Sequence, residues 1–217
     1  LLSTLIEIED KADDPFFYEE SPSLCSFMAK MAAYSIIEQP VCVIGAPGAG
    51  KTSAARAFSR MRPRKSVDKI GFRMHSFHSN TKVSHFFGSN TLIDGSIVFR
   101  DGTLTASLKS GLVFIADEFN LSSQSVMKSV ALALDSTIGK NVFIPGIGQT
   151  INIAPEFQFI ACQNGLETVG RNAIPDSILQ RFICIDYPKQ EKKDIQNICI
   201  SIAKDHLNQN IKTEDKE

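Results

Sequence analysis

The chain has 217 residues, of which 43% are hydrophobic and 22% are charged, a balance typical of globular proteins rather than of disordered or fibrous chains. Its 23 basic and 24 acidic side chains give a formal net charge of -1, so no overall charge attracts it to nucleic acid or anionic lipid. The length suits one domain, or one domain and part of a second.

The five cysteines are scattered without a CxxC pair, which predicts free thiols in a reducing compartment. The sequence has no signal-peptide pattern and no apolar run of about 18 residues. We therefore expect a soluble intracellular protein of the cytoplasm or nucleus that makes no membrane contact. Because the chain lacks an initiating Met and has a charged end, we expect a segment of a longer polypeptide.

In chain order, residues 1–23 form an acidic lead-in segment. Apolar side chains then recur at near-helical spacing over residues 24–37, which predicts a helix that ends before Pro40. The apolar run at residues 41–44 predicts a buried strand, and a glycine-rich loop and a helix over residues 52–61 follow it. Further strands are expected at residues 70–76, 112–116, 157–162 and 182–185, with helices between them at 122–134 and 176–181.

Strands that alternate with helices predict an α/β fold, a three-layer sandwich around a mostly parallel five-stranded sheet. Residues 94–102 and 142–153 interrupt this rhythm with turn dipeptides, and each is predicted to form an inserted β-hairpin. Residues 191–206 carry apolar side chains on one face and predict an amphipathic helix that starts a second subdomain. In sheets of this kind, ligands bind beyond the carboxyl ends of the strands.

The segment from Gly45 to Thr52 matches the pattern G-x-x-x-x-G-K-[ST] without a mismatch, between a predicted strand and a predicted helix. Glycines let such a loop direct backbone N–H groups at phosphate oxygens, and the helix N-terminus favours negative charge. Lys51 is expected to reach the β- and γ-phosphates, and the Thr52 hydroxyl is expected to help hold Mg²⁺. The predicted nucleotide-binding residues are Gly45, Ala46, Pro47, Gly48, Ala49, Gly50, Lys51, Thr52 and Ser53.

Two adjacent carboxylates, Asp117 and Glu118, follow the apolar strand predicted at residues 112–116. Such a strand end is commonplace by itself. In a chain that also carries the phosphate-binding loop, it predicts that Asp117 binds Mg²⁺, directly or through water. Glu118 is then placed to orient and deprotonate the attacking water. The expected ligands are ATP and Mg²⁺.

Over roughly residues 40–188 the chain resembles the AAA+ ATPases, a branch of the P-loop NTPases. The loop, the Asp117-Glu118 strand end, residues 157–164 and residues 174–182 occur in the order seen in that family. The closest resemblance is to the dynein-related, midasin-like and MoxR-like branch, in which Asn-Leu follows Asp-Glu. The resemblance implies an AAA+ nucleotide-binding core at residues 24–188 and the truncated start of a helical lid at residues 189–217.

Further roles follow from the resemblance alone. It implies that Asn164 is sensor 1, which helps to position the lytic water and senses the γ-phosphate. Arg181 is implied to be the arginine finger, which acts in trans on nucleotide held by a neighbouring subunit. The alternative for Arg181 is a helix-terminal residue that pairs with the helix dipole, and Arg171 is a second candidate for the finger. Residues 94–102 resemble the helix-2 insert and residues 142–153 resemble the hairpin before sensor 1, elements that in relatives often face the pore or a client. The alternative is that both hairpins are structural decoration.

The function expected from these features is ATP binding and hydrolysis that move a macromolecular client, a protein or ribonucleoprotein. Neighbouring AAA+ modules form the expected ring of six, either as separate subunits or along one chain. Two rival hypotheses are a nucleotide-binding module that does not hydrolyse ATP and a nucleic-acid motor from another P-loop branch. The presence of Glu118 argues against the first, and the near-neutral charge argues against the second and against direct nucleic-acid binding.

Overall fold

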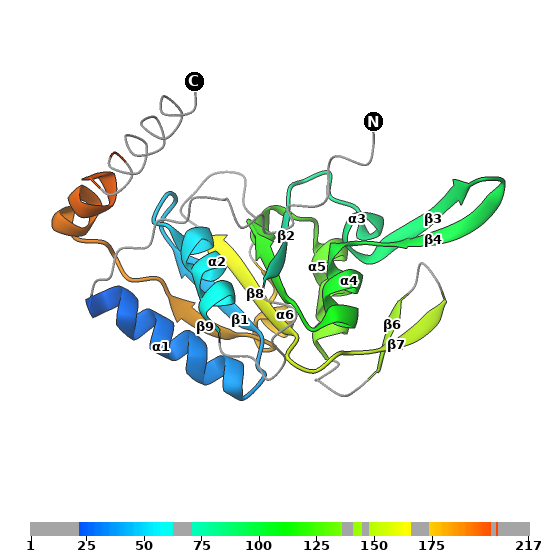
Figure 1. Ribbon diagram of the computed structural model, residues 1–217, viewed down its shortest axis with the longest axis horizontal. Helices are drawn as coiled ribbons and strands as arrows, with labels where there is room; N and C mark the ends of the chain where they lie inside the picture. The colour runs from blue at the N-terminus through cyan, green and yellow to red at the C-terminus, as the bar shows by residue number, and fades with distance from the viewer. Residues whose placement is uncertain are drawn as a thin grey trace, which may run out of the picture.

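A computed structural model gives the fold of residues 22–62, 71–135, 141–144, 148–165, 174–200 and 203. Its centre is a parallel five-stranded sheet with the strand order β2-β5-β8-β1-β9 (Figure 1). The strands are β1 (Val41–Gly45), β2 (Phe72–Ser76), β5 (Val113–Asp117), β8 (Gln158–Asn164) and β9 (Ile183–Asp186). The sheet confirms the predicted α/β class and the number of core strands.

Helices cover both faces of the sheet, and each face has its own apolar core (Figure 1). Side chains of a strand point alternately to the two faces, so a strand covered on both sides is apolar throughout. On β5, Ile115 packs with the core beneath α1 (Pro22–Ile36) and α2 (Lys51–Met61). Its neighbour Phe114 packs with the core beneath α4 (Thr103–Ser110) and α5 (Gln124–Leu134). This is the predicted three-layer sandwich.

The parallel register brings the ends of separate strands to one edge of the sheet. Gly45 of β1 pairs with Asn164 of β8, and Ser76 of β2 pairs with Asp117 of β5. The turn that carries Glu118 follows Asp117 directly and continues into the short 3₁₀ helix η1 (Phe119–Leu121). Lys51 and Asn164, which are 113 residues apart in sequence, therefore meet at this carboxyl edge.

Two hairpins extend from the sandwich, as predicted, but the first one starts earlier than expected. It consists of β3 (Gly88–Ile93) and β4 (Ser96–Asp101), so the predicted range 94–102 contains only its turn and second strand. The prediction was wrong here because, after the buried Gly88, β3 continues with the exposed polar residues Ser89, Asn90 and Thr91, which give no apolar alternation. The second hairpin, β6 (Asn141–Ile144) with β7 (Gln149–Asn152), confirms the predicted range 142–153.

The remaining elements lie close to their predicted positions, with a few exceptions. Helix α1 begins at Pro22, inside the predicted lead-in segment, whose residues 1–21 lie outside the described part of the chain. Helix α6 (Asp176–Leu179) lies within its predicted range. Helices α3 (Val83–Phe87) and α4 (Thr103–Ser110) were not predicted. Residues 192–200 and 203 are helical, in agreement with the predicted helix at 191–206, and the rest of that range is outside the description. All five cysteines are free thiols.

Among the described residues, the structure contains no helix with the length and apolar character that spanning a membrane requires.

The half-buried imidazole of His75 is expected to make the fold sensitive to acid. Its ring lies 4.8 Å from that of Phe77 and 6.0 Å from that of Phe86. Burial lowers the pKa of His75 to about 4, and repulsion from His85 and His78 adds to this. The unfolded chain takes up a proton near pH 6.5, so stability is lost as the pH falls from about 6.5 toward about 4.

Denaturant unfolding is expected to give a free energy of unfolding lower at pH 5 than at pH 7 by roughly 1 kcal/mol from His75, after a discount for its partial exposure. His75→Phe, which cannot titrate and suits the aromatic surroundings, is expected to remove that part of the pH dependence. An unchanged pH dependence in this variant would contradict the assignment to His75.

Candidate functional site

The segment Gly45 to Thr52 connects β1 to α2 as a tightly curved loop at the carboxyl edge of the sheet. Gly48 and Gly50 have φ angles of 69° and 97°, a left-handed conformation that glycine adopts without a Cβ clash. Gly50 is also the residue that precedes α2, so the N-terminus of this helix opens at the loop. Backbone N–H groups and the positive end of the helix dipole make such a loop suited to phosphate.

Lys51 lies back across this loop and is only 6% exposed. Its Nζ donates hydrogen bonds to the backbone oxygens of Gly45 at 3.1 Å and Ala46 at 2.7 Å. A third bond, of 2.6 Å, reaches Oδ1 of Asn164 at the end of β8. The lysine therefore connects the loop to the neighbouring strand end.

The first of the two carboxylates, Asp117, faces the start of α2. The hydroxyl Oγ1 of Thr52 donates a hydrogen bond of 2.8 Å to Oδ1 of Asp117. Burial raises the pKa of Asp117 above its usual value, and so does the nearby Glu118, while the bond from Thr52 and the charge of Lys51 act in the opposite direction. Hydroxyl and carboxylate oxygens are ligands of the kind that Mg²⁺ binds, and a divalent cation here would offset the burial of the negative charge.

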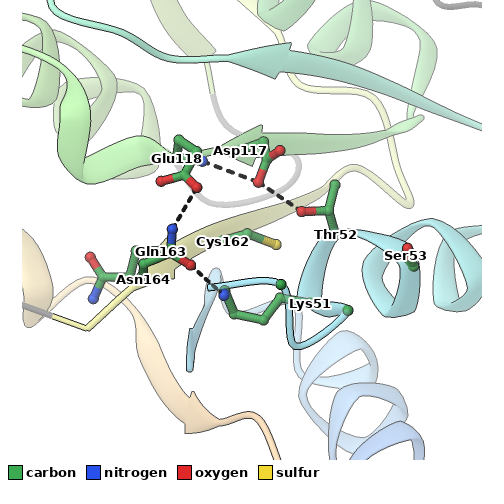
Figure 2. A pocket seen from close by; sticks show the side chains of 10 residues that line it. Lys51, Thr52, Ser53, Asp117, Glu118, Cys162, Gln163 and Asn164 are labelled. Atoms are coloured by element: carbon green, nitrogen blue, oxygen red, sulfur yellow. Dashed lines mark hydrogen bonds between the residues drawn. The ribbon is translucent and has the colours of Figure 1, made fainter. Parts of the chain in front are cut away.

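The second carboxylate, Glu118, lies at a sharp turn of the backbone. Its φ of 52° is in the left-handed region, where a residue with a Cβ costs roughly 1–2 kcal/mol, a strain that often marks functional sites. The turn directs its side chain back to the end of β8, where Nδ2 of Asn164 donates to Oε1 of Glu118 at 2.6 Å. The Asn164 amide, 5% exposed, thus bonds to both Lys51 and Glu118 (Figure 2).

These side chains line one pocket of about 270 Å³ (Figure 2). Its lining residues are Gly48, Gly50, Lys51, Thr52, Ser53, Asp117, Glu118, Cys162, Gln163 and Asn164. The structure thereby brings together the loop, the acidic pair and Asn164, which the sequence predicted separately. Of the other predicted loop residues, Gly45 and Ala46 receive the hydrogen bonds of Lys51, and Pro47 and Ala49 lie in the loop without lining this pocket.

Cys162 and Gln163 line the pocket but were not predicted as site residues. Their position directly before Asn164 on the same strand was the available signal. Burial raises the pKa of the Cys162 thiol, with a further contribution from the charge of Asp117, so this wall of the pocket is neutral.

Arg181 lies away from this pocket, near the amino ends of the parallel strands. It precedes β9, whose first residue, Ile183, pairs with Val41 at the start of β1. Four residues of strand span about 13 Å, so Arg181 and the loop after β1 are separated by at least that length. The guanidinium donates from Nε at 2.5 Å and from its terminal nitrogen at 2.8 Å to the two carboxylate oxygens of Asp135, and it also contacts the backbone oxygen of Ser177.

The hydrogen bond from Arg181 lowers the pKa of Asp135, the direction expected for a carboxylate in an ion pair. Arg181 lies outside the pocket that Lys51, Asp117 and Glu118 line. Arg171, the second basic candidate, lies outside the described residues.

Comparisons with family models and with individual proteins find sequences similar to this chain. The family model of the AAA domain, dynein-related subfamily, matches residues 40–182. Midasin from Dictyostelium discoideum is 30% identical over 164 residues, which cover 73% of this chain but only 3% of midasin. The gas vesicle ATPase GvpN1 from Halobacterium salinarum is 25% identical over 189 residues, 76% of this chain and 51% of that protein.

A solved structure shares the fold. The crystal structure of a Cytophaga hutchinsonii protein, provisionally named an ATPase, matches 83% of this chain and 51% of its own with a TM-score of 0.65. At 18% sequence identity, this likeness concerns the fold alone. The chain thus spans about half of this structure and of GvpN1, and a small part of midasin.

Proposed function

The chain belongs to the dynein-related subfamily of AAA domains, an ATPase-type nucleotide-binding family, and we propose that it binds ATP with Mg²⁺ and hydrolyses it to ADP and phosphate. One observation carries the proposal. In a single pocket, Thr52 bonds to Asp117, and a chain of hydrogen bonds runs from Lys51 through Asn164 to Glu118. This pocket combines a phosphate cradle, an oxygen donor set for a cation and a carboxylate base.

The loop and Lys51 are proposed to bind the triphosphate. Nζ of Lys51 donates to the neutral oxygens of Gly45, Ala46 and Asn164. A phosphate oxygen is a stronger acceptor for an ammonium group, because the bond is assisted by opposite charge. The lysine is already held beside the loop, so little reorganisation is needed when the β- and γ-phosphates bind.

Thr52 and Asp117 are proposed to hold Mg²⁺, directly or through water. A cation held by these two residues would supply positive charge that offsets the negative charge developing on the transferred phosphoryl group. The 2.8 Å hydrogen bond between Oγ1 of Thr52 and Oδ1 of Asp117 keeps these two oxygens together at the N-terminus of α2.

Glu118 is proposed to be the general base. Its carboxylate accepts a proton from a water molecule whose oxygen forms a bond to the γ-phosphorus, while the bond from that phosphorus to the β-phosphate oxygen breaks and ADP leaves. The bond from Nδ2 of Asn164 orients the carboxylate, and the same amide, as sensor 1, is proposed to contact the γ-phosphate side of the pocket.

Steady-state release of phosphate from ATP by the full-length protein, with and without Mg²⁺, tests this function. We expect Mg²⁺-dependent release. Tight ATP binding without release would contradict it and would favour the rival hypothesis of a nucleotide-binding module without turnover.

We further propose that the domain works in a ring of six AAA+ modules and acts on a macromolecular client, a protein or ribonucleoprotein. The likeness to midasin supports this choice of branch. The place of Arg181 supports a ring, because the residue lies at the opposite edge of the sheet from its own pocket and needs a neighbour to act on nucleotide. The division into a core at residues 24–188 and a lid start at 189–217 is part of the same proposal.

In the assembled ring, Arg181→Ala is expected to lower ATP turnover by about 10³-fold, because an arginine finger stabilises charge on the transferred phosphoryl group. ATP affinity of the same module's own pocket is expected to stay unchanged. Asp135→Asn removes the carboxylate partner but keeps the arginine, so a smaller loss is expected. Phosphate release and ATP titration measure both effects, and wild-type turnover in Arg181→Ala rings would exclude the finger role.

A further inference from the structure

Asn120 is completely buried, with an exposed fraction of 0%, and lies next to the pocket-lining residues without lining the pocket itself. It lies on η1, two positions after Glu118, and its Nδ2 donates a hydrogen bond of 3.1 Å to the backbone oxygen of Asn164. The bond spans 44 residues of sequence. It therefore connects the turn that carries Glu118 to the strand end that carries Asn164.

This contact occurs where the sheet itself no longer connects the two strands. The pairing between β5 and β8 ends at Ala116 with Ala161, whereas β8 continues to Asn164. Beyond Ala161, β8 still pairs with β1, through Gly45 and Asn164. On the β5 side, the hydrogen bond from the Asn120 amide to the Asn164 carbonyl connects the two strands instead.

The platform that presents Asn120 is fixed by aromatic packing. Phe119, 0% exposed, contacts the rings of Phe77, Phe159 and Phe182 at centroid distances of 5.4, 6.4 and 6.1 Å. The buried hydroxyl of Ser122 donates to the Phe119 backbone oxygen at 2.8 Å. Because this packing holds η1 in place, the Asn120 side chain has little conformational freedom. Its hydrogen bond therefore fixes the position of the Asn164 backbone oxygen.

We propose that Asn120 is a positioning residue for hydrolysis, which holds the end of β8 so that the Asn164 side chain reaches both Lys51 and Glu118 at 2.6 Å. The inference rests on the proposed ATP hydrolysis and adds a residue to it. Without this bond, the strand end is free to shift away from Glu118, and a misplacement of about 1 Å in a catalytic group lowers rates by about 100-fold. The backbone N–H groups proposed to hold the phosphates belong to the loop after β1 and to the start of α2, so ATP binding is expected to depend little on Asn120.

The test measures kcat and KM for ATP in the full-length protein carrying Asn120→Ala. We expect kcat to fall by about 10- to 100-fold and KM to change by less than about twofold. Asn120→Ser is the second variant, in case the alanine variant does not fold, and its short hydroxyl cannot reach the Asn164 carbonyl, so the same loss is expected. Ser107→Ala is the matched control, because Ser107 is also 0% exposed and its hydroxyl donates a hydrogen bond of 3.0 Å to the Thr103 backbone oxygen within α4, outside the pocket lining.

A double-mutant cycle separates positioning from a general structural role. If Asn120 acts through Asn164, the variant with both Asn120→Ala and Asn164→Ala is expected to turn over no more slowly than Asn164→Ala alone. The Asn120→Ser change gives the same cycle. Additive losses, a wild-type kcat in the folded serine variant, or an equal loss in Ser107→Ala would each overturn the proposal.

Glu118→Gln in the same assay distinguishes the two levels of inference. If turnover responds to Glu118→Gln but not to the Asn120 variants, only the positioning role is wrong. If Glu118→Gln leaves turnover unchanged, the proposed hydrolysis mechanism is wrong and the role of Asn120 is overturned with it.

Discussion

Replacing Glu118 with glutamine is expected to lower ATP turnover by about 10²- to 10⁴-fold, the usual contribution of a positioned general base. Glutamine keeps the size of the side chain and an oxygen that can accept the 2.6 Å bond from Nδ2 of Asn164. It lacks the carboxylate that accepts a proton from water. ATP affinity is therefore expected to change little, so the variant should bind ATP and fail to release phosphate.

Steady-state phosphate release and equilibrium titration with ATP, performed on the same preparation, measure the two quantities separately. Asp94→Asn is a suitable control, since it removes a carboxylate at the exposed turn of the first hairpin, between β3 and β4. Turnover in Glu118→Gln within a few-fold of wild type would contradict the role of general base. A parallel loss of ATP affinity would show instead that the substitution disturbs the pocket.

The second large effect is expected from Lys51→Ala, which should weaken ATP binding by roughly 100-fold. Hydrogen bonds to charged groups contribute about 1.5–3 kcal/mol, and the upper value corresponds to about this factor. The ammonium group lies in the pocket, with Nζ at 2.7 Å from the Ala46 oxygen and 2.6 Å from Oδ1 of Asn164. Removing it takes away the positive charge that the β- and γ-phosphates would contact.

Calorimetric titration with ATP in the presence of Mg²⁺ measures this change. Lys109→Ala is the matched control, because that lysine is exposed and pairs with Asp101 at 2.7 Å on the surface. Its loss is expected to leave ATP affinity within about twofold, as surface ion pairs contribute little. An affinity in Lys51→Ala equal to that of the control would contradict the phosphate-binding role.

The fold and the components of the site were predictable because their signals are local. Gly45 to Thr52 is a contiguous pattern between a strand and a helix, and Asp117 and Glu118 end an apolar run. Parallel strands then bring such ends to one edge of the sheet, so their convergence follows from the fold class. The first hairpin was misplaced because residues 89–91 of β3 are polar and exposed, and no apolar period indicates such a strand.

The connections between these components were not predictable from sequence. Asn120 contacts a carbonyl 44 positions away, and Arg181 pairs with Asp135 at a separation of 46. Either side chain, seen in sequence, is an ordinary polar residue at the end of a helix or turn. Their partners depend on how far β8 continues beyond its last residue paired with β5, and on how α5 ends beside Arg181.

The central claim is that the loop after β1 and the carboxylates after β5 hold the same metal-bound triphosphate. A crystal structure of the protein with Mg²⁺ and a non-hydrolysable ATP analogue tests it most directly. We expect Lys51 to contact the β- and γ-phosphates, Mg²⁺ to lie between Thr52 and Asp117, and Glu118 to face the γ-phosphate. A triphosphate bound elsewhere, or a cation that neither Thr52 nor Asp117 approaches directly or through water, would contradict the account.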